Sequence, residues 1–294
     1  MNSAVTGLRS LNIGVTDLEA ATRFYTDVWG LRLVERTSDA AYLRATGENY
    51  YVLGLYRRST AAALRVDLRA ANKAAVDALY AAVINSSGTT LTHPANLDAP
   101  GGGYGFDLRE PEGRTIRIVT RDDRHADCDD VPDVPRKISH VVLDSPDREG
   151  AFLRQILGFK LSDQSRKITF LRCCSDHHSI ALYKRDHAGF NHVAFEMPSF
   201  DGVMRGAGRM RDAGYPIEWG VGRHGPANNV FCYFLGPDDY VIEYTSDVEQ
   251  IDDSYHVGTP EDWTWPPGRT DRWGIHHGPT ERMKEAEGKI LFAT

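Results

Sequence analysis

Hydrophobic and polar residues follow one plan in four segments of the chain. Each segment opens with an apolar run typical of a buried strand, continues with the spacing of an amphipathic helix, and passes a glycine before further strands. The first and third segments contain "LNIGVTDLEAATRFYTDVWG" and "ISHVVLDSPDREGAFLRQILG", and the second and fourth contain "LRVDLRAANKAAVDALYAAVINSSG" and "FNHVAFEMPSFDGVMRGAGRMRDAG". The repeat predicts four modules rich in β-α-β structure, arranged in two pairs.

The spacing within the segments supports this division into two halves. Asn12 lies 18 residues before Gly30, and His140 lies 18 residues before Gly158. We predict an N-terminal domain over 1–121, a linker over 122–135 that is acidic and contains proline, and a C-terminal domain over 136–246. The remaining 247–294 form a tail rich in Trp and Pro, which we expect to be mostly loop and to pack on the protein through its tryptophans.

Composition narrows the classes of partner and compartment. Hydrophobic residues make up 41% of the chain, and the net charge of −7 without a Lys/Arg run argues against nucleic acid or an anionic membrane as partner. We expect no membrane span, because no apolar run has the required length. We expect no secretory signal, because the start "MNSAVTGLRS" lacks a charged region followed by an apolar one. The four cysteines form no C-x-x-C pair, which favours free thiols in the cytoplasm.

Comparison of the two halves shows that three candidate metal ligands occur in the second half only. His140, His192 and Glu243 each lie in the middle of an apolar strand, in "ISHVVL", "FNHVAF" and "YVIEYT". By spacing, the first half carries Asn12, Val66 and Arg117 instead. A buried glutamate is costly unless it is paired, whereas a single buried histidine can be an ordinary core residue. Three such residues in one half only therefore predict a metal site.

The three residue types leave the metal and the reaction open. Two histidines and one carboxylate match the ligand set of non-haem Fe(II) oxygenases, and Mn(II) suits the same ligands. Zn(II) could bind them too and would point to hydrolytic or isomerase chemistry.

Further motifs accompany the three candidate ligands. "LRCCSDHHSIALY" carries His177 and His178 on what we expect to be a strand, so that the two side chains point to opposite faces. "GRHGPANNVFCYFLGPDDYVIEY" places His224 nine residues before Tyr233, and Glu243 ten residues further on. With the candidate ligands, these motifs resemble those of the type I extradiol ring-cleavage dioxygenases of the vicinal oxygen chelate superfamily, over about 1–250.

The resemblance implies an α+β fold of two domains, in which paired βαβββ modules curl into half-barrels and only the C-terminal domain holds metal. It also implies that His140, His192 and Glu243 bind Fe(II), with Mn(II) as the alternative. His178 is then an acid/base, and Tyr233 and His224 contact the substrate. Cys232, Gly236 and Asp239 depart from the usual pattern of the motif, which bears on the subfamily.

The implied reaction opens the ring of a catechol-type substrate beside its two hydroxyls, with incorporation of both atoms of O₂. By position, Val142, Phe170 and Ile180 are expected to form an apolar pocket wall, with Trp263–Pro267 closing over it. We also expect a homo-oligomer. The alternatives are another metal-dependent reaction of the superfamily, such as a glyoxalase-type isomerisation or hydrolysis, and a metal-free protein that binds small molecules.

Overall fold

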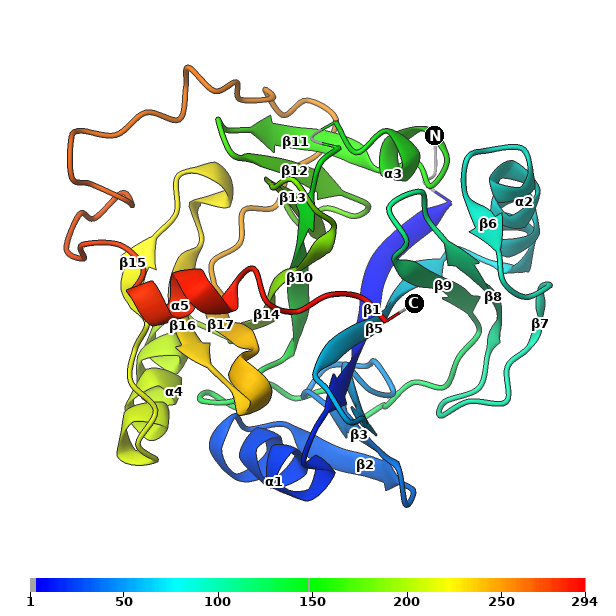
Figure 1. Ribbon diagram of the computed structural model, residues 1–294, viewed down its shortest axis with the longest axis horizontal. Helices are drawn as coiled ribbons and strands as arrows, with labels where there is room; N and C mark the ends of the chain where they lie inside the picture. The colour runs from blue at the N-terminus through cyan, green and yellow to red at the C-terminus, as the bar shows by residue number, and fades with distance from the viewer. Residues whose placement is uncertain (1–3, 148, 294) are drawn as a thin grey trace.

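Two mixed β-sheets, one from each half of the chain, form the body of the protein (Figure 1). The computed structural model describes residues 4–147 and 149–293.

The N-terminal sheet contains β1 (Val5–Val15), β2 (Arg32–Arg36), β3 (Ala40–Arg44), β4 (Leu53–Arg57), β5 (Ala62–Ala70), β6 (Thr89–Thr90), β7 (Ala95–Asn96), β8 (Tyr104–Arg109) and β9 (Thr115–Thr120). The C-terminal sheet contains β10 (Lys137–Ser145), β11 (Lys160–Gln164), β12 (Ile168–Arg172), β13 (Ile180–Lys184), β14 (Gly189–Glu196), β15 (Trp219–Arg223), β16 (Val230–Leu235) and β17 (Val241–Ser246). The α-helices are α1 (Leu18–Arg23), α2 (Lys73–Ile84), α3 (Ala151–Gln155), α4 (Phe200–Asp212) and α5 (Glu281–Ala286), and short helical turns cover Phe24–Val28, Pro226–Asn228 and Pro237–Asp239.

The two sheets have the same strand order, which is the clearest sign of the internal repeat. The N-terminal order is β2-β3-β4-β1-β5-β9-β8-β6, and the C-terminal order is β11-β12-β13-β10-β14-β17-β16-β15. Within each module the first strand runs parallel to the last, as in β10 with β13 and β14 with β17. The two modules of a half join through an antiparallel pair, β1 with β5 or β10 with β14. The predicted two-domain α+β fold of paired βαβββ modules is confirmed.

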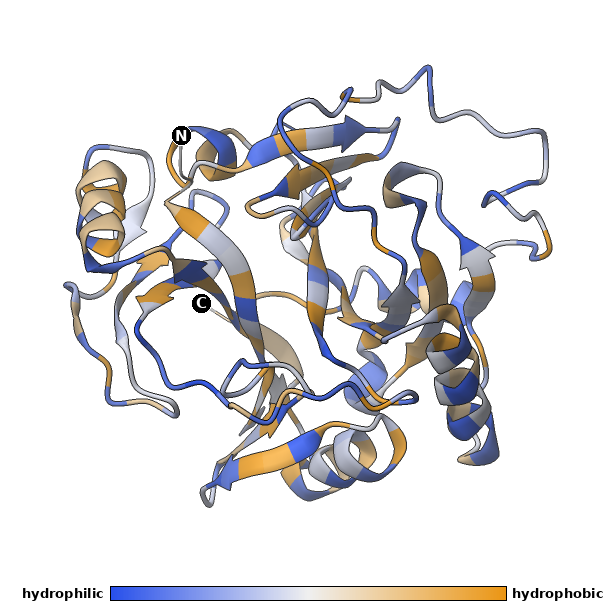
Figure 2. Cartoon of the chain, turned by 180° about the vertical axis from the view of Figure 1, so that it is seen from behind, coloured by the Kyte–Doolittle hydropathy of each residue, from blue (hydrophilic) through white to orange (hydrophobic). Residues whose placement is uncertain are grey.

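Local sequence explains where the crossover helices begin. Asp17, Asn72 and Ser199 each precede a helix, and their side-chain oxygens accept a hydrogen bond from a backbone N–H in its first turn. Hydrophobic residues concentrate on the strands, whereas the connecting loops are mostly hydrophilic (Figure 2). This distribution builds a core between the sheets and the helices, which gives the central strands a rigid setting.

The C-terminal tail wraps around the C-terminal domain before it returns to the centre of the molecule. In Figure 1 it passes the ends of β11 to β13, reaches β15, and places α5 beside β15 and β16. Its last residues form isolated bridges, Phe190 with Ile290 and Ala63 with Phe292, so the tail contacts both halves. None of the helices in the described residues is long and apolar enough to cross a membrane.

Candidate metal centre and cavity

Three central strands of the C-terminal sheet bring His140, His192 and Glu243 together. His140 pairs with Ala194 across β10 and β14, and Ala194 pairs with Glu243 across β14 and β17. Because side chains alternate along a strand, this register places all three side chains on one face of the sheet. One ligand atom from each residue lies within 4.8 Å of the others, and all three residues are buried.

The ring and carboxylate atoms of this cluster that could bind a metal lie close to one another. Glu243 Oε2 lies 3.2 Å from His140 Nε2 and 3.4 Å from His192 Nε2. Both His192 Nε2 and Glu243 Oε2 are buried without a hydrogen-bond partner among the described residues. Burial by itself would raise the pKa of Glu243, but the adjacent His140 and His192 hold it well below its usual value. Orphaned atoms of this kind fit a bound cation, and the donor set fits Fe(II), Mn(II) or Zn(II).

Neighbouring polar groups fix the orientation of the two imidazoles. Asn191 Oδ1 lies 2.7 Å from His192 Nδ1, and Asn191 in turn donates a hydrogen bond of 3.0 Å to Asp144. Ser139 Oγ lies 3.1 Å from His140 Nδ1. Each contact occupies Nδ1 and leaves Nε2 free, which is the arrangement that metal-binding histidines require. Sequence reasoning missed Asn191 and Ser139, although each directly precedes a candidate ligand.

The corresponding place in the N-terminal half is filled by ion pairs. The strand registers align His140 with Ser10 and His192 with Arg65, so the equivalence with Asn12 and Val66 inferred from spacing is wrong by two residues and one residue. The bulges next to Ser10 and His140 occupy equivalent positions, so the offset arises between the strand and the glycine: Gly30 follows Ser10 by 20 residues, whereas Gly158 follows His140 by 18. Glu243 aligns with Arg117, as inferred. Arg65 bonds to buried Asp67, and Arg117 bonds to Asp107. Two guanidinium groups thus stand where the C-terminal half has His192 and Glu243, and their positive charge disfavours a cation at this place.

His177 and His178 lie in the loop between β12 and β13, not on a strand. The expectation of opposite faces is therefore wrong: both rings are buried, and their Nδ1 atoms lie 3.2 Å apart. The ring centroid of His178 is 4.1 Å from that of His140. Burial and the neighbouring histidines hold the pKa of His178 well below its usual value, so its imidazole is neutral at pH 7.

His224 and Tyr233 meet at the opposite edge of the cluster. Tyr233 pairs with Glu243 across β16 and β17, and its hydroxyl lies 3.0 Å from His224 Nε2. Burial and then Glu243 raise the pKa of Tyr233 well above its usual value, so the phenol keeps its proton. Burial lowers the pKa of His224 to about 4. The pair therefore offers neutral hydrogen-bonding groups to a bound molecule.

A cavity of about 530 Å³ opens over these residues. His140, His192, His178, His224 and Tyr233 all line it. Its walls also include the expected Val142 and Phe170, together with Trp219, Ile168 and Met283, and four cationic side chains contribute as well: Arg166, Lys167, Arg269 and Lys284. Ile180 is instead fully buried in the hydrophobic core, because it starts β13 beside Val141 rather than beside Val142.

The tail contributes to this cavity, as its tryptophans suggested. Trp263 and Trp265 are among the lining residues. A Cβ atom on Gly225 would lie 2.5 Å from Trp265 and 3.2 Å from Trp263, so the glycine after His224 makes room for both indoles. Glu287, which follows α5, also lines the cavity and was not anticipated from the sequence.

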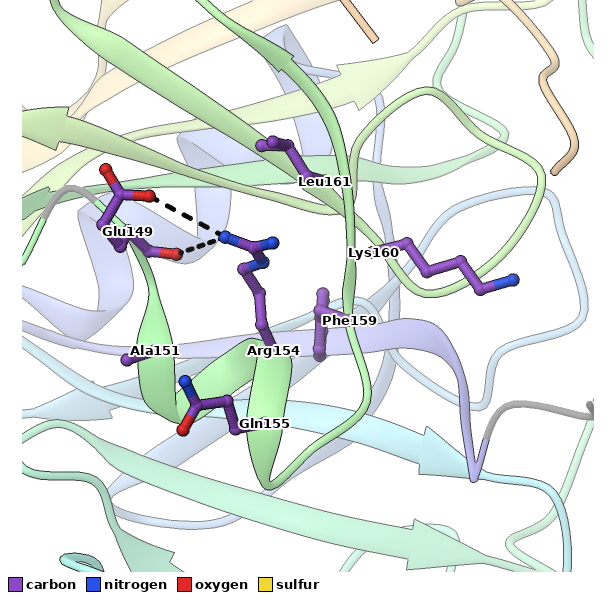
Figure 3. A pocket seen from close by; sticks show the side chains of 7 residues that line it. All are labelled: Glu149, Ala151, Arg154, Gln155, Phe159, Lys160 and Leu161. Atoms are coloured by element: carbon purple, nitrogen blue, oxygen red, sulfur yellow. Dashed lines mark hydrogen bonds and ion pairs between the residues drawn. The ribbon is translucent and has the colours of Figure 1, made fainter. Parts of the chain in front are cut away.

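A second pocket, of about 470 Å³, lies beside α3 (Figure 3). Its seven lining residues include no histidine, and its visible polar contacts join Arg154 to Glu149. The buried histidine cluster therefore belongs to the cavity over β10, β14 and β17 and not to this pocket.

Known proteins share both the sequence pattern and the fold. The profile of the Glyoxalase/Bleomycin resistance protein/Dioxygenase superfamily matches residues 7–131 and 137–244. Metapyrocatechase 2 of Cupriavidus necator is 34% identical over 181 residues, which are 60% of this chain and 48% of that protein. The chain thus spans about half the length of this relative. A manganese-dependent 2,3-dihydroxybiphenyl 1,2-dioxygenase of Geobacillus genomosp. 3 is 24% identical over 251 residues, or 75% of this chain and 78% of that protein.

A solved structure gives a longer match. The Mn(II)-bound glyoxalase from Novosphingobium aromaticivorans is 38% identical with a TM-score of 0.89, and the alignment covers 95% of this chain and 94% of that one. The two profile matches coincide with the two halves of the strand repeat. The chain belongs to the Glyoxalase/Bleomycin resistance protein/Dioxygenase superfamily.

Proposed function

We propose that this protein is an extradiol dioxygenase, which uses O₂ to open the ring of a catechol-type substrate beside its two hydroxyls. The observation that carries the proposal is the buried cluster of His140, His192 and Glu243, with unpartnered atoms that face one point beneath the cavity. We assign Fe(II) to this site, with Mn(II) as the alternative. Two relatives bear on the metal, because one is named manganese-dependent and the other was solved with Mn(II).

The bound metal would supply a path for electrons between the catechol and O₂, whose triplet ground state otherwise reacts sluggishly with a closed-shell molecule. His178 would accept and return a proton, since its imidazole is neutral and lines the cavity beside His140. Tyr233 would donate a hydrogen bond to a substrate oxygen, and His224 would orient that hydroxyl.

The walls of the cavity support a proposal for the class of substrate. Phe170, Val142 and Trp219 offer aromatic and aliphatic surface that suits an aromatic ring with an apolar substituent or a fused ring. The cavity also contains cationic side chains, which could bind a carboxylate on the substrate. A catechol with an anionic substituent is therefore compared with uncharged catechols in the test below. The homo-oligomer and the cytoplasmic location stay predictions from the sequence.

A second candidate comes from the solved relative that is named a glyoxalase. A reaction of that class would use the same cavity and a divalent metal without O₂. The single carboxylate in the metal cluster favours the dioxygenase, because glyoxalase-type sites usually carry two.

The test combines metal analysis with an oxygen-dependent assay. The full chain, loaded anaerobically with Fe(II) or Mn(II), is mixed with catechol, 3-methylcatechol, 2,3-dihydroxybiphenyl and a catechol carboxylate before O₂ is admitted. We expect a yellow product and O₂ uptake only after that step, lost in His192→Ala and retained in His187→Ala, which changes an exposed histidine. Zinc binding without O₂ uptake would favour the second candidate.

A further inference from the structure

A buried carboxylate lies behind the His177-His178 pair, on the side away from the cavity. Asp163 in β11 is fully buried, and its Oδ2 lies 2.8 Å from His177 Nε2. On the other side of the ring, His177 Nδ1 contacts His178 Nδ1. Asp163, His177 and His178 therefore form a continuous hydrogen-bonded row that ends at the cavity.

The tail completes the surroundings of the carboxylate. The Tyr255 hydroxyl donates a hydrogen bond of 3.1 Å to Asp163 Oδ2, and the backbone N–H of Gly258 donates one of 2.7 Å to Oδ1. The Tyr255 ring also packs edge-on against His177, and Phe170 packs edge-on against both histidines. Packing on two sides leaves the imidazoles little freedom to rotate.

Hydrogen-bond chemistry then determines which nitrogens carry protons. The Gly258 N–H and the Tyr255 hydroxyl both donate to the Asp163 carboxyl group, which is thus an acceptor here. His177 then carries its proton on Nε2, and its Nδ1 is an acceptor. The proton between the two Nδ1 atoms therefore belongs to His178, whose Nε2 is left with a free lone pair. His178 lines the cavity, and this nitrogen is the one not engaged with His177.

We propose that Asp163 and His177 are a positioning pair that selects the tautomer of His178 and so makes its Nε2 a proton acceptor. The inference rests on the proposed function in giving His178 a proton to move. Asp holds histidine in the same way in the Ser-His-Asp triad.

Asp163→Asn provides the sharpest test, because the fold fixes how the new amide must point. The Gly258 N–H can only donate, so the amide oxygen stays toward it and the NH₂ group faces His177 Nε2. His177 must then hold its proton on Nδ1 and donate it to His178, which moves the His178 proton to Nε2. The variant thus converts the cavity-facing nitrogen from acceptor to donor without changing the shape of the side chain.

The first measurement is ¹⁵N NMR of the full chain with labelled histidine and no added metal. We expect the His178 proton on Nδ1 in the wild type and on Nε2 in Asp163→Asn. In the metal-loaded enzyme, kcat should fall by about 10- to 10⁴-fold while KM stays within about twofold, as for loss of a tautomer or an outer-shell partner. Asp122→Asn is the control, because it changes a buried aspartate that Arg9 and Arg69 bond in the other half.

Two results would overturn the inference: an unchanged His178 tautomer in Asp163→Asn, or a changed tautomer with unchanged kcat. If Asp163→Asn does not fold, His177→Phe retains the aromatic packing and removes both contacts, and we then expect the His178 proton to distribute over both nitrogens. A wild type without catechol turnover would refute the proposed function, whereas the NMR result would still decide the inference.

Discussion

Asn191 Oδ1 lies 2.7 Å from Nδ1 of His192 and thereby directs the other ring nitrogen toward Glu243. This contact leads to the first prediction. Asn191→Ala removes the acceptor and frees the imidazole to rotate, so we expect metal affinity to fall about 10- to 100-fold. Equilibrium titration of the metal-free protein with Mn(II) measures the change.

Asn96→Ala serves as the control for Asn191→Ala, because Asn96 is an exposed asparagine in β7, in the half of the protein without the metal cluster. Equal affinity of Asn191→Ala and the wild type would show that Asn191 does not orient His192.

The second prediction concerns the fit between Gly225 and the tail. In Gly225→Ala the new methyl group would lie 2.5 Å from Trp265, so the indole in the cavity wall must shift. We expect KM for 2,3-dihydroxybiphenyl to rise about tenfold with a smaller change for catechol, because the larger substrate reaches the displaced wall. Steady-state kinetics with both substrates checks this.

A matched substitution separates this effect from a general consequence of adding a methyl group. Gly208 in α4 has open space at its Cβ position, so Gly208→Ala should leave both KM values unchanged. A parallel rise in KM for the two substrates in Gly225→Ala would contradict a role of the indoles in fitting the larger ring.

The third prediction addresses the ion pairs of the N-terminal half. Asp67 accepts hydrogen bonds from Ser10, Asn12, Tyr51 and Arg65. Asp67→Ala leaves buried cationic charge without its partner, so the free energy of unfolding should fall by about 3–5 kcal/mol. Denaturant unfolding measures the loss, and Mn(II) affinity should be unchanged because the metal site lies in the other half.

The Asp67 carboxylate also makes the stability of the protein depend on pH. Burial opposes its ionisation, but Arg65, with further arginines, holds the pKa of Asp67 below its usual value. Its contribution is therefore present above about pH 3.9, the value in the unfolded chain, and is lost as the pH falls below that point. An unfolding free energy of Asp67→Ala that differs from the wild type by less than about 1 kcal/mol at pH 7 would refute this account.

The fourth prediction uses Glu287 at the cavity wall. Burial raises the pKa of Glu287 to about 7, against the effect of Arg185. Between about pH 4.3 and 7 the folded state holds a proton that the unfolded state has released, so stability rises as the pH falls through this window. Above pH 7 the buried charge is destabilising, and Glu287→Gln should be about 1–3 kcal/mol more stable at pH 8.

Unfolding experiments at pH 8 and pH 5 test this, and the advantage of Glu287→Gln should shrink at the lower pH. Glu285→Gln changes an exposed residue of α5, two positions before Glu287, and should have no such effect. A constant difference between Glu287→Gln and the wild type at both pH values would show that Glu287 does not titrate in this range.

The sequence by itself determined the repeat and the strands that carry the chemistry. Apolar runs and helical spacing are local signals, and their recurrence in four segments was enough to predict paired modules with His140, His192 and Glu243 in the middle of apolar strands. Side chains alternate between the two faces of a sheet, so the observed register places these three residues on one face. The exact equivalence of positions between the two halves was not visible, because the connections between each strand and its glycine differ in length by one or two residues.

Only the tertiary structure decided what surrounds these residues. The contact between Tyr255 and Asp163 spans 92 positions, and the tail reaches it through a path of loops that no periodicity encodes. The same holds for the burial of His177 in a loop, for Glu287 at the cavity wall, and for the arginines that fill the N-terminal half. Local spacing fixes which side chains a strand presents, whereas contacts between distant loops depend on how the whole chain packs.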